Sequence, residues 1–376
     1  MINSVGYRRV SKNRPCSICG KPDWCSTTAT ETISFCARST TNADRISPHG
    51  WGVFYDHDPG LQLARPFRPI PARKKFAHSP ALAPPEITDR VYRKLIELSP
   101  ASSSDEIVCG RGGLRDRGVL DHANYGSFPK TVRGRDALVG KLVQAFAGDR
   151  ALIPLSFSGV PGFWRDEDGE TRLGSRKDSV EDLMLIPFIG FDGRIRACQI
   201  RFMKFVSNRS GRYIWLSSSN ERTGCGSGAP LHHACPHSAS NEPVLVTEGA
   251  LKAATAQRFL IDRYVVGNSG VATSHREIIG TARGRPLEIA FDLDSFTNPH
   301  VARALAALVR LRYSDQASFG YGDGVRIVVW DGPIKGIGEA LLAQVPLLHL
   351  SVPEWLKRLS PKCLGEATRQ LAPLTQ

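Results

Sequence analysis

The C-terminal part of the chain alternates short apolar runs with longer segments of helical periodicity. From about residue 241 the apolar runs read PVLVT, YVV, PLEIAF and VRIVVW, and segments such as ALKAATAQRFL and HVARALAALVRLR lie between them. Strands separated by helices of about 10 to 15 residues are typical of βαβ units and a parallel sheet. The pattern therefore predicts an α/β domain over residues 241–345. A C-terminal tail over residues 346–376 would cap this domain or dock a partner.

The part before residue 241 predicts a mixed α+β subdomain over residues 88–240. Val91, Leu95 and Leu98 recur at helical spacing after Thr88. Farther along, the apolar runs LMLIPFI and IRACQIRF flank the sequence FDGR, which is typical of a hairpin turn.

A segment rich in proline, arginine and lysine precedes this subdomain. The density of proline over residues 56–87 disfavours regular structure and predicts a semi-rigid basic linker. Its cations either keep a spacer soluble or contact phosphate groups directly.

Four of the nine cysteines crowd near the start of the chain, in the order Cys16-x2-Cys19-x5-Cys25-x10-Cys36. A CxxC pair presents two thiolates to one ion, and two more cysteines complete a closed tetrahedral sulfur site, which is typical of structural zinc. The spacing therefore predicts a zinc-binding module over residues 10–55. The alternatives are free thiols, three ligating cysteines, or His49 in place of Cys25.

The charge balance indicates the kind of partner. In 376 residues, 49 Lys and Arg outnumber 36 Asp and Glu, which gives a net charge of +13. Such an excess indicates a polyanion, most commonly nucleic acid. Trp24 lies among basic residues of the zinc module and either stacks on bases or packs against the module. No apolar run approaches the roughly 20 residues of a membrane span, and the N-terminus lacks an apolar segment, so we expect a cytoplasmic protein without a membrane partner.

Acidic residues follow the predicted parallel strands. They are Glu248, Asp292, Asp294, Asp331 and Glu339. In an open parallel sheet the carboxyl ends of the strands lie at one edge, where ligands bind, and strand alternation would turn Asp292 and Asp294 to the same side. Carboxylates gathered there repel one another unless a cation shares them, and Mg²⁺ or Mn²⁺ suits such ligands. A single acid at a strand end is otherwise commonly a helix N-cap.

The motifs VTEGALKA and FDLDS resemble those of the Toprim domain, which DnaG-type primases, topoisomerases and OLD-type nucleases share. Together with the cysteine module, LIPFIGFDGRIRACQIR, GAPLHHA and IKGIGEAL, they resemble the primase region encoded by phages, plasmids and other mobile elements. The resemblance covers about residues 14–345. It implies an α/β (overall α+β) chain with a zinc-ribbon-like module, an α+β primase subdomain and a Toprim domain. In it, Glu248 is the glutamate of the first motif, and Asp292 and Asp294 are metal ligands in the catalytic site.

The resemblance also implies a DNA primase, a nucleotidyltransferase that uses single-stranded DNA and nucleoside triphosphates in the bacterial cytoplasm or nucleoid. Because the sequence has no P-loop motif, a replicative helicase is expected as a separate polypeptide. Lys252 either pairs with Glu248 one helical turn away or reaches a phosphate. Basic residues are candidates for nucleotide or nucleic-acid binding, although a solvated surface explains any single one of them. With Trp24, these candidates are Arg111, Arg115, Arg117, Arg194, Arg196, Lys252 and Lys335.

The last motif departs from the family. Residues 335–339 read KGIGE, where such proteins usually have Lys-Gly-x-Asp-Asp, so Gly338 replaces one acid and Glu339 the other. This weakens a second metal site and leaves two alternatives to primer synthesis open. One is a non-catalytic, zinc-dependent DNA-binding replication accessory, and the other is a metal-dependent Toprim nuclease. The segment Gly224–His237 lacks metal-binding spacing, so a glycine-rich loop near the substrate is a better interpretation than a second metal site.

Overall fold

The computed structural model describes most of the chain in two compact units. One unit comprises residues 1–72 with 208–210, and the other comprises residues 73–207 with 211–376. The described residues are 7–28, 33–39, 43, 45–46, 51–55, 80–101, 105–109, 113–117, 121–148, 157–204, 211–236, 241–322 and 324–372. Most of the predicted linker, Arg111, His49 and His237 therefore lie outside the described residues.

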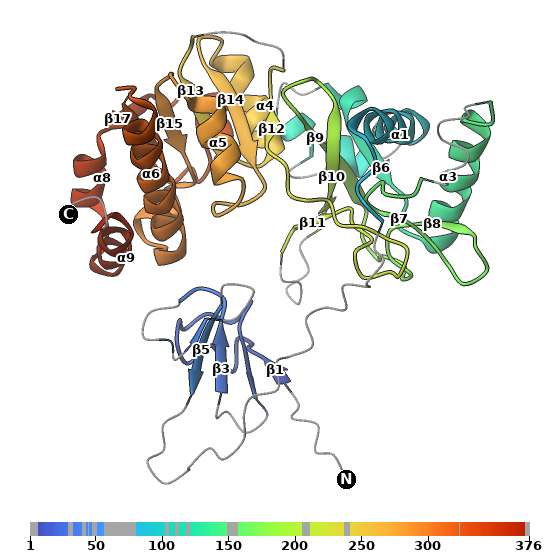
Figure 1. The fold of residues 1–376 in the computed structure, drawn as a ribbon, viewed down its shortest axis with the longest axis horizontal. Coiled ribbons are helices and arrows are strands. Elements are labelled where there is room, and N and C mark those ends of the chain that lie inside the picture. Colours follow the sequence, from blue (N-terminus) through green and yellow to red (C-terminus); the bar gives the residue numbers. More distant parts are fainter. Residues whose placement is uncertain are drawn as a thin grey trace. The chain divides into compact units, whose positions relative to one another are not determined.

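The first unit contains a small antiparallel sheet (Figure 1), and Cys36 is the last residue of one of its strands. Val10, Cys16, Cys25 and Cys36 form its buried apolar cluster, and Phe35 and Val53 are buried as well, so the cysteines supply much of a very small core. Such a module needs a further source of stability, which a structural metal ion provides. Its strands, in spatial order, are β1 (Tyr7–Arg9), β2 (Ser26–Thr28), β3 (Ile33–Cys36), β5 (Gly52–Tyr55) and β4 (Arg45–Ile46).

The second unit begins with an antiparallel sheet that two helices cover. The spatial order of its strands is β11 (Tyr213–Trp215), β10 (Ile195–Phe202), β9 (Leu183–Ile189) and β6 (Gly126–Phe128). Apolar side chains of α1 (Pro85–Leu98) and α3 (Val132–Ala145) pack with those of the sheet in one core. The other elements of this part are α2 (Asp105–Cys109), η2 (Arg115–Arg117), η3 (His122–Asn124), β7 (Phe163–Arg165) and β8 (Thr171–Leu173).

Two sequence predictions for this part can be compared with the structure. The sequence FDGR forms the turn between the antiparallel strands β9 and β10, as its flanking apolar runs predict. Helix α1 begins at Pro85, inside the segment predicted to be a linker. Proline is well tolerated in the first turn of a helix, because the N–H groups there have no partner within the helix.

The rest of the second unit is a six-stranded sheet with helices on both faces (Figure 1). Its strands, in spatial order, are β12 (His232–His233), β14 (Tyr264–Asn268), β13 (Val244–Glu248), β15 (Leu287–Ala290), β16 (Val325–Trp330) and β17 (Leu347–Leu350). The four central strands are parallel, and both edge strands pair antiparallel with their neighbours. The mixed α+β fold class that the sequence predicts is therefore confirmed.

The two faces of this sheet have separate cores. Helices α5 (His275–Ala282) and α6 (Pro299–Phe319) contribute to the larger core, and α4 (Ala250–Phe259) and α7 (Ile337–Leu342) contribute to the other. The segment predicted as a C-terminal tail supplies the edge strand β17 and two further helices. These are α8 (Val352–Arg358) and α9 (Pro361–Leu371), which bury Trp355 and Cys363 in the larger core.

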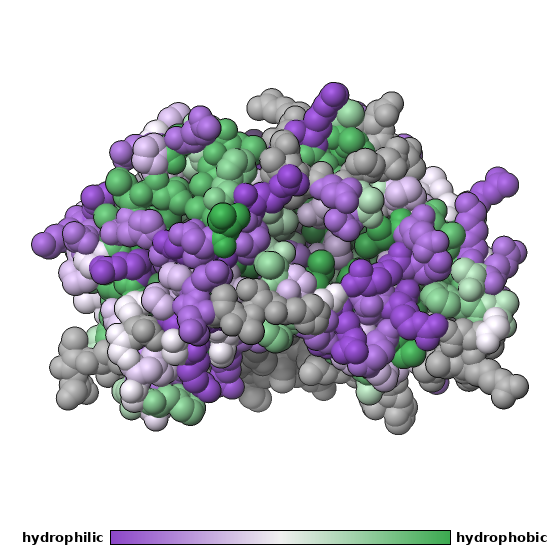
Figure 2. All heavy atoms as spheres, turned by 90° about the horizontal axis from the view of Figure 1, so that it is seen from above, coloured by the Kyte–Doolittle hydropathy of each residue, from purple (hydrophilic) through white to green (hydrophobic). Residues whose placement is uncertain are grey.

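Helix boundaries follow local chemistry. Asn298 caps α6 by accepting a hydrogen bond from the backbone N–H of His300, and the helix ends at Gly320, whose φ is 70°. Ser351 and Glu354 form a capping box at the start of α8. No described helix is long and apolar enough to cross a membrane. On the face shown in Figure 2, hydrophilic residues are interspersed with apolar ones.

Candidate functional site

Three of the five predicted acidic residues lie at the carboxyl edge of the six-stranded sheet. Glu248 is the last residue of β13, and Asp292 lies two residues beyond the end of β15. Asp292 precedes the short helix η4 (Leu293–Phe296), which contains Asp294. Strand alternation therefore does not place these two aspartates, because both follow the strand. The backbone N–H of Asp292 donates a hydrogen bond to Glu248 Oε1 over 3.3 Å, so the two acids lie side by side.

Two lysines contact these carboxylates. Lys252, in the first turn of α4, donates a hydrogen bond to Asp292 Oδ1 rather than pairing with Glu248. Lys335 Nζ lies 3.5 Å from Asp292 Oδ2 and 3.2 Å from Asp294 Oδ2. Asp292 is only 5% exposed, so the lysines balance a carboxylate that water hardly reaches.

The electrostatics of the edge suit a cation. Burial, and then the negative charge of Asp292, raise the pKa of Glu248 to about 7, while Lys252 opposes this shift. Asp294 Oδ1 is buried without a hydrogen-bond partner. Carboxylate oxygens are hard ligands of the kind that Mg²⁺ and Mn²⁺ prefer. The donor set of Glu248, Asp292 and Asp294 therefore fits a divalent cation, although these oxygens are less tightly grouped than the cysteine sulfurs.

A cavity of about 220 Å³ opens beside these acids. It lies between the antiparallel sheet and the six-stranded sheet of the second unit, and we name it the edge pocket. Its lining residues come from both sheets and include the backbone that follows Glu248. They are Arg117, Ile186, Gln199, Tyr213, Glu248, Gly249, Ala250, Leu251, Lys252, Ser269 and Asp292.

The turn after β13 depends on glycine. Gly249 has a φ of 86°, which favours a residue without a Cβ atom, and it directly precedes α4. Its N–H donates a hydrogen bond to the backbone carbonyl of Asn268, at the end of the neighbouring strand β14. Because of this turn, Lys252 lies at the same edge of the sheet as Glu248. The conformation of the turn explains why a glycine follows Glu248.

Arg117 and Glu339 form an ion pair across 222 positions of the sequence. Arg117 Nη1 donates to Glu339 Oε1 over 2.6 Å, which joins η2 to α7. The sequence predicted them separately, as a nucleotide-binding cation and a metal ligand. Arg117 lines the edge pocket and Glu339 lies next to it, but Glu339 Oε1 accepts a hydrogen bond from Arg117. This oxygen is therefore not a free metal ligand.

Other predicted residues lie elsewhere. Arg194 and Arg196 each pair with Asp192 over 2.8 Å at the β9–β10 turn. Arg115 is exposed and donates to Cys109 Sγ. Asp331 is exposed after β16 and does not line the edge pocket.

Arg201 is a further basic residue, from the run FDGRIRACQIR, that is a candidate for binding nucleotide or template. It lies on β10, is 1% exposed, and has two guanidinium nitrogens, Nε and Nη1, without a hydrogen-bond partner. Its guanidinium lies 5.6 Å from the centre of the Tyr213 ring, and burial lowers its pKa. Burying an unpaired cation is costly, so an anion is the expected partner. The signal in the sequence was the run of basic residues Arg194, Arg196 and Arg201 in FDGRIRACQIR.

The four cysteines of the first unit form the second candidate site. Among the described residues, they alone form a group of three or more possible metal ligands whose ligand atoms all lie within 4.8 Å of one another. Hydrogen bonds from Cys25 and Cys36 lower the pKa of Cys16, and Cys16 in turn raises the pKa values of the other two. The thiols thus compete for one negative charge, which a zinc ion would relieve by replacing their protons. The cluster of four cysteines fits structural zinc.

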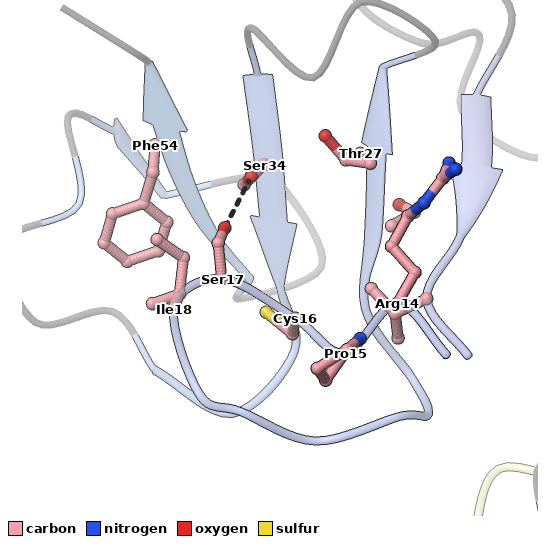
Figure 3. Close-up of a pocket in the computed structure, with 10 residues that line it drawn as sticks. Arg14, Pro15, Cys16, Ser17, Ile18, Thr27, Ser34 and Phe54 are labelled. Carbon is pink, nitrogen blue, oxygen red and sulfur yellow. Dashed lines mark hydrogen bonds between the residues drawn. The ribbon is translucent and has the colours of Figure 1, made fainter. Parts of the chain in front are cut away.

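The surface of this module carries aromatic and basic groups. Trp24 is 54% exposed, and the neighbouring Arg38 pairs with Asp23 over 2.7 Å. A hollow of about 410 Å³ lies on the same module, with Arg14 and Phe54 among its lining residues (Figure 3). Ser17 Oγ and Ser34 Oγ lie 3.2 Å apart within it. Because its ring is largely exposed, Trp24 is available for stacking.

Comparisons with known proteins give structural neighbours only. No family model matches the sequence, and no curated protein matches it. One solved structure, the zinc-binding and RNA polymerase domains of the Aquifex aeolicus primase, has 16% identity and a TM-score of 0.45, and the match covers 76% of this chain and 67% of that one. The RNA polymerase domain of Mycobacterium tuberculosis primase DnaG has 16% identity and a TM-score of 0.48, with 77% and 99% covered. A DnaG primase catalytic domain bound to ssDNA has 15% identity and a TM-score of 0.44, with 77% and 93% covered.

Proposed function

We propose that this chain is a metal-dependent nucleotidyltransferase that synthesises short primers on single-stranded DNA. One observation carries the proposal: Glu248 and Asp292 line a pocket whose other wall presents Arg117 and Tyr213, and Lys335 joins Asp292 to Asp294. Acids that hold a cation, next to cations that hold phosphates, are the arrangement that nucleotidyl transfer requires. The Toprim motifs that these acids belong to support the same conclusion.

The triphosphate would bind in the edge pocket. Arg117 lines the pocket, and Arg201, whose Nε and Nη1 lack hydrogen-bond partners, lies over the ring of Tyr213. Tyr213 is partly exposed and offers a ring face to a base. Lys335 is 68% exposed at its side chain and can move from the aspartates to a phosphate. These side chains would orient the nucleotide so that its α-phosphorus faces the 3′-hydroxyl of the growing primer.

The reaction forms a bond between the 3′-oxygen and the α-phosphorus, breaks the bond to pyrophosphate, which leaves, and releases the proton of the 3′-hydroxyl to solvent. Glu248, Asp292 and Asp294 would hold Mg²⁺ or Mn²⁺. When bound, the ion would neutralise charge that develops on the phosphates. Arg117 would keep Glu339 away from the triphosphate by holding its carboxylate. The contribution of the chain is therefore positioning and charge balance.

The zinc module would contact the template. Its exposed Trp24 can stack on a base, and the +13 charge of the chain favours a polyanion. The proposal includes nucleoside triphosphates and single-stranded DNA as partners, together with a separately encoded replicative helicase. It places the protein in the bacterial cytoplasm or nucleoid, in the replication of a phage, plasmid or other mobile element.

The test uses the zinc-loaded full chain with single-stranded DNA, labelled nucleoside triphosphates and Mg²⁺ or Mn²⁺. The wild type should make short oligomers, and the double variant Asp292→Asn with Asp294→Asn should make at least about 100-fold less. Asp262→Asn, at an exposed acid away from the site, is the matched control and should keep full activity. Unchanged product from the double variant would show that the acids are wrongly assigned.

A second candidate function is a non-catalytic DNA-binding replication accessory. The observations that favour it are Gly338 in place of an acid and the two lysines already bound to Asp292. Under this alternative, DNA binding needs zinc, is indifferent to Mg²⁺, and no nucleotide is turned over. A nuclease is detected in a separate incubation of labelled single-stranded DNA with Mg²⁺ or Mn²⁺ and without nucleoside triphosphates. A nuclease would cut the labelled DNA under these conditions.

A further inference from the structure

Lys252 occupies an unusual place for a cation in a site proposed to bind metal ions. Its ammonium group donates to Asp292 Oδ1, and its side chain is 18% exposed. We propose that Lys252 is a built-in cation that takes the place of one divalent ion, so that the edge pocket binds one Mg²⁺ or Mn²⁺ per chain rather than two. This inference rests on the proposed metal-dependent function and defines how the site is charged.

The surroundings fix the path of Lys252. A Cβ atom at Gly336 would lie 2.9 Å from Lys252 Cε, 3.2 Å from Nζ and 2.6 Å from Glu339 Oε2. The end of the lysine side chain therefore lies against the backbone that leads into α7, and a Cβ atom at position 336 would displace it. The ammonium group of Lys252 is therefore held in place by this backbone and by its buried partner Asp292.

Lys335 differs from Lys252 in this respect. Its side chain is largely exposed, and its contacts with Asp292 and Asp294 are 3.5 Å and 3.2 Å long. A side chain of this kind gains little from an ion pair in water and can leave it. Of the two lysines, only Lys252 is a permanent part of the site.

The charge balance then favours one divalent ion. Glu248, Asp292 and Asp294 carry three negative charges when ionised, and Lys252 neutralises one of them. Glu339 is already paired with Arg117. One divalent cation neutralises the remaining two charges, whereas a second would bring uncompensated positive charge into a partly buried site.

The ligand atoms agree with this balance. Lys252 takes Asp292 Oδ1, and the backbone N–H of Asp292 donates to Glu248 Oε1. Asp294 Oδ1 remains buried without a partner. Gly338 has no side chain and therefore offers no ligand to a metal ion. Asp292 Oδ2 and both oxygens of Asp294 are therefore the carboxylate oxygens that Lys252 does not take, and they would serve one ion once Lys335 moves away.

The test counts bound ions. The zinc-loaded full chain is titrated with Mn²⁺ in buffer freed of divalent ions, and free Mn²⁺ is measured by electron paramagnetic resonance. The wild type should bind one Mn²⁺ per chain. Lys252→Met, which removes the charge but keeps much of the side-chain volume, should bind two. Lys252→Arg, which keeps the charge, and Lys94→Met, at a half-buried lysine paired with Glu97, should each bind one.

Thermal unfolding gives an independent readout. Without Mn²⁺, Lys252→Met should melt about 5 °C or more below the wild type, because Asp292 loses its buried partner. Saturating Mn²⁺ should restore most of that difference. Lys94→Met should melt close to the wild type with and without Mn²⁺.

The outcomes separate this inference from the proposed function. Two Mn²⁺ bound by the wild type, or one Mn²⁺ still bound by Lys252→Met, would overturn the inference and leave primer synthesis in place. A wild type that binds one Mn²⁺ but makes no primer would contradict the proposed function alone. No bound Mn²⁺ in the wild type would overturn both. The wild-type count decides even where a variant does not fold.

Discussion

At the residue scale, His232 and His233 are buried in their neutral form. The backbone N–H of Ile189 donates to His232 Nδ1, and His233 Nδ1 lies 2.8 Å from Tyr264 Oη. Burial and the neighbouring His233 lower the pKa of His232 to about 3. Burial, and then the positive charge of Arg285, lower the pKa of His233 to about 4. These two side chains hold together the edge strand β12 and its neighbours, so their charge state affects stability.

The protein should lose stability as pH falls from about 6.5 towards 4. In this range the unfolded chain takes up protons on both histidines while the folded chain does not, so each histidine removes up to about 1.4 kcal/mol per pH unit. Above about pH 6.5 the effect is absent. His233→Gln should show a shallower fall in melting temperature between pH 7 and pH 5 than the wild type. Parallel curves for the two proteins would contradict the assignment.

The cysteine cluster gives a second prediction at this scale. Cys25→Ser should lower bound zinc, measured by mass spectrometry of metals in the purified protein, from one equivalent to well below one, because a hydroxyl is a far poorer zinc ligand than a thiolate. Cys235→Ser, at an exposed cysteine outside the cluster, is the control and should keep one equivalent. Zinc loss in the control instead would point to the segment around residues 225–235.

At the element scale, the start of α7 determines how the site is packed. Gly336 precedes the helix and Gly338 lies in its first turn. A Cβ atom at Gly338 would make only ordinary contacts, the nearest being 3.4 Å from Thr255 Cγ2, whereas one at Gly336 would displace Lys252 and Glu339. The two glycines therefore differ: a side chain at position 336 would meet the ends of Lys252 and Glu339, whereas one at position 338 would fit.

The two alanine variants should therefore shift stability in opposite directions. Gly338→Ala should stabilise the fold by about 0.5 kcal/mol, because alanine loses less backbone entropy than glycine in a helix. Gly336→Ala should lower the melting temperature, because it moves Lys252 from the buried Asp292. Differential scanning calorimetry of both variants measures the two shifts. Stabilisation by both substitutions would show that Lys252 does not need the space at Gly336.

At the scale of the whole molecule, the chain consists of two units with separate cores. The first depends on its cysteines, because it buries few apolar side chains. The second contains four apolar clusters among its described residues and includes the edge pocket. The units should therefore differ in their response to metal removal.

Removing zinc should unfold the first unit and leave the second folded. After chelation, limited proteolysis should digest the zinc module while a fragment containing residues from about 80 to 372 survives, and the main calorimetric transition should stay within about 2 °C. Re-addition of zinc should restore protection. Loss of the main transition on chelation would mean that the second unit depends on the first.

The sequence by itself predicted what depends on local pattern. Apolar runs alternating with helical segments predicted the parallel strands β13, β14, β15 and β16, because strand and helix periods are local properties. The spacing of the four cysteines predicted a sulfur cluster, since a CxxC turn places two sulfurs together whatever the rest of the chain does. The position of Glu248 and Asp292 at the ends of neighbouring strands predicted a shared edge, because parallel strands end on the same side.

Only the tertiary structure decided which of these side chains contact one another. Lys252 reaches Asp292, 40 positions away, rather than Glu248 in the preceding turn, and Arg117 reaches Glu339 across 222 positions. The segment predicted as a C-terminal tail forms the edge strand β17, which pairs with β16, and the helices α8 and α9, which pack on an apolar face of the sheet. Only the structure shows that Arg201 is buried with two guanidinium nitrogens, Nε and Nη1, that lack hydrogen-bond partners. Such contacts depend on how distant segments pack, and no local period or spacing encodes that.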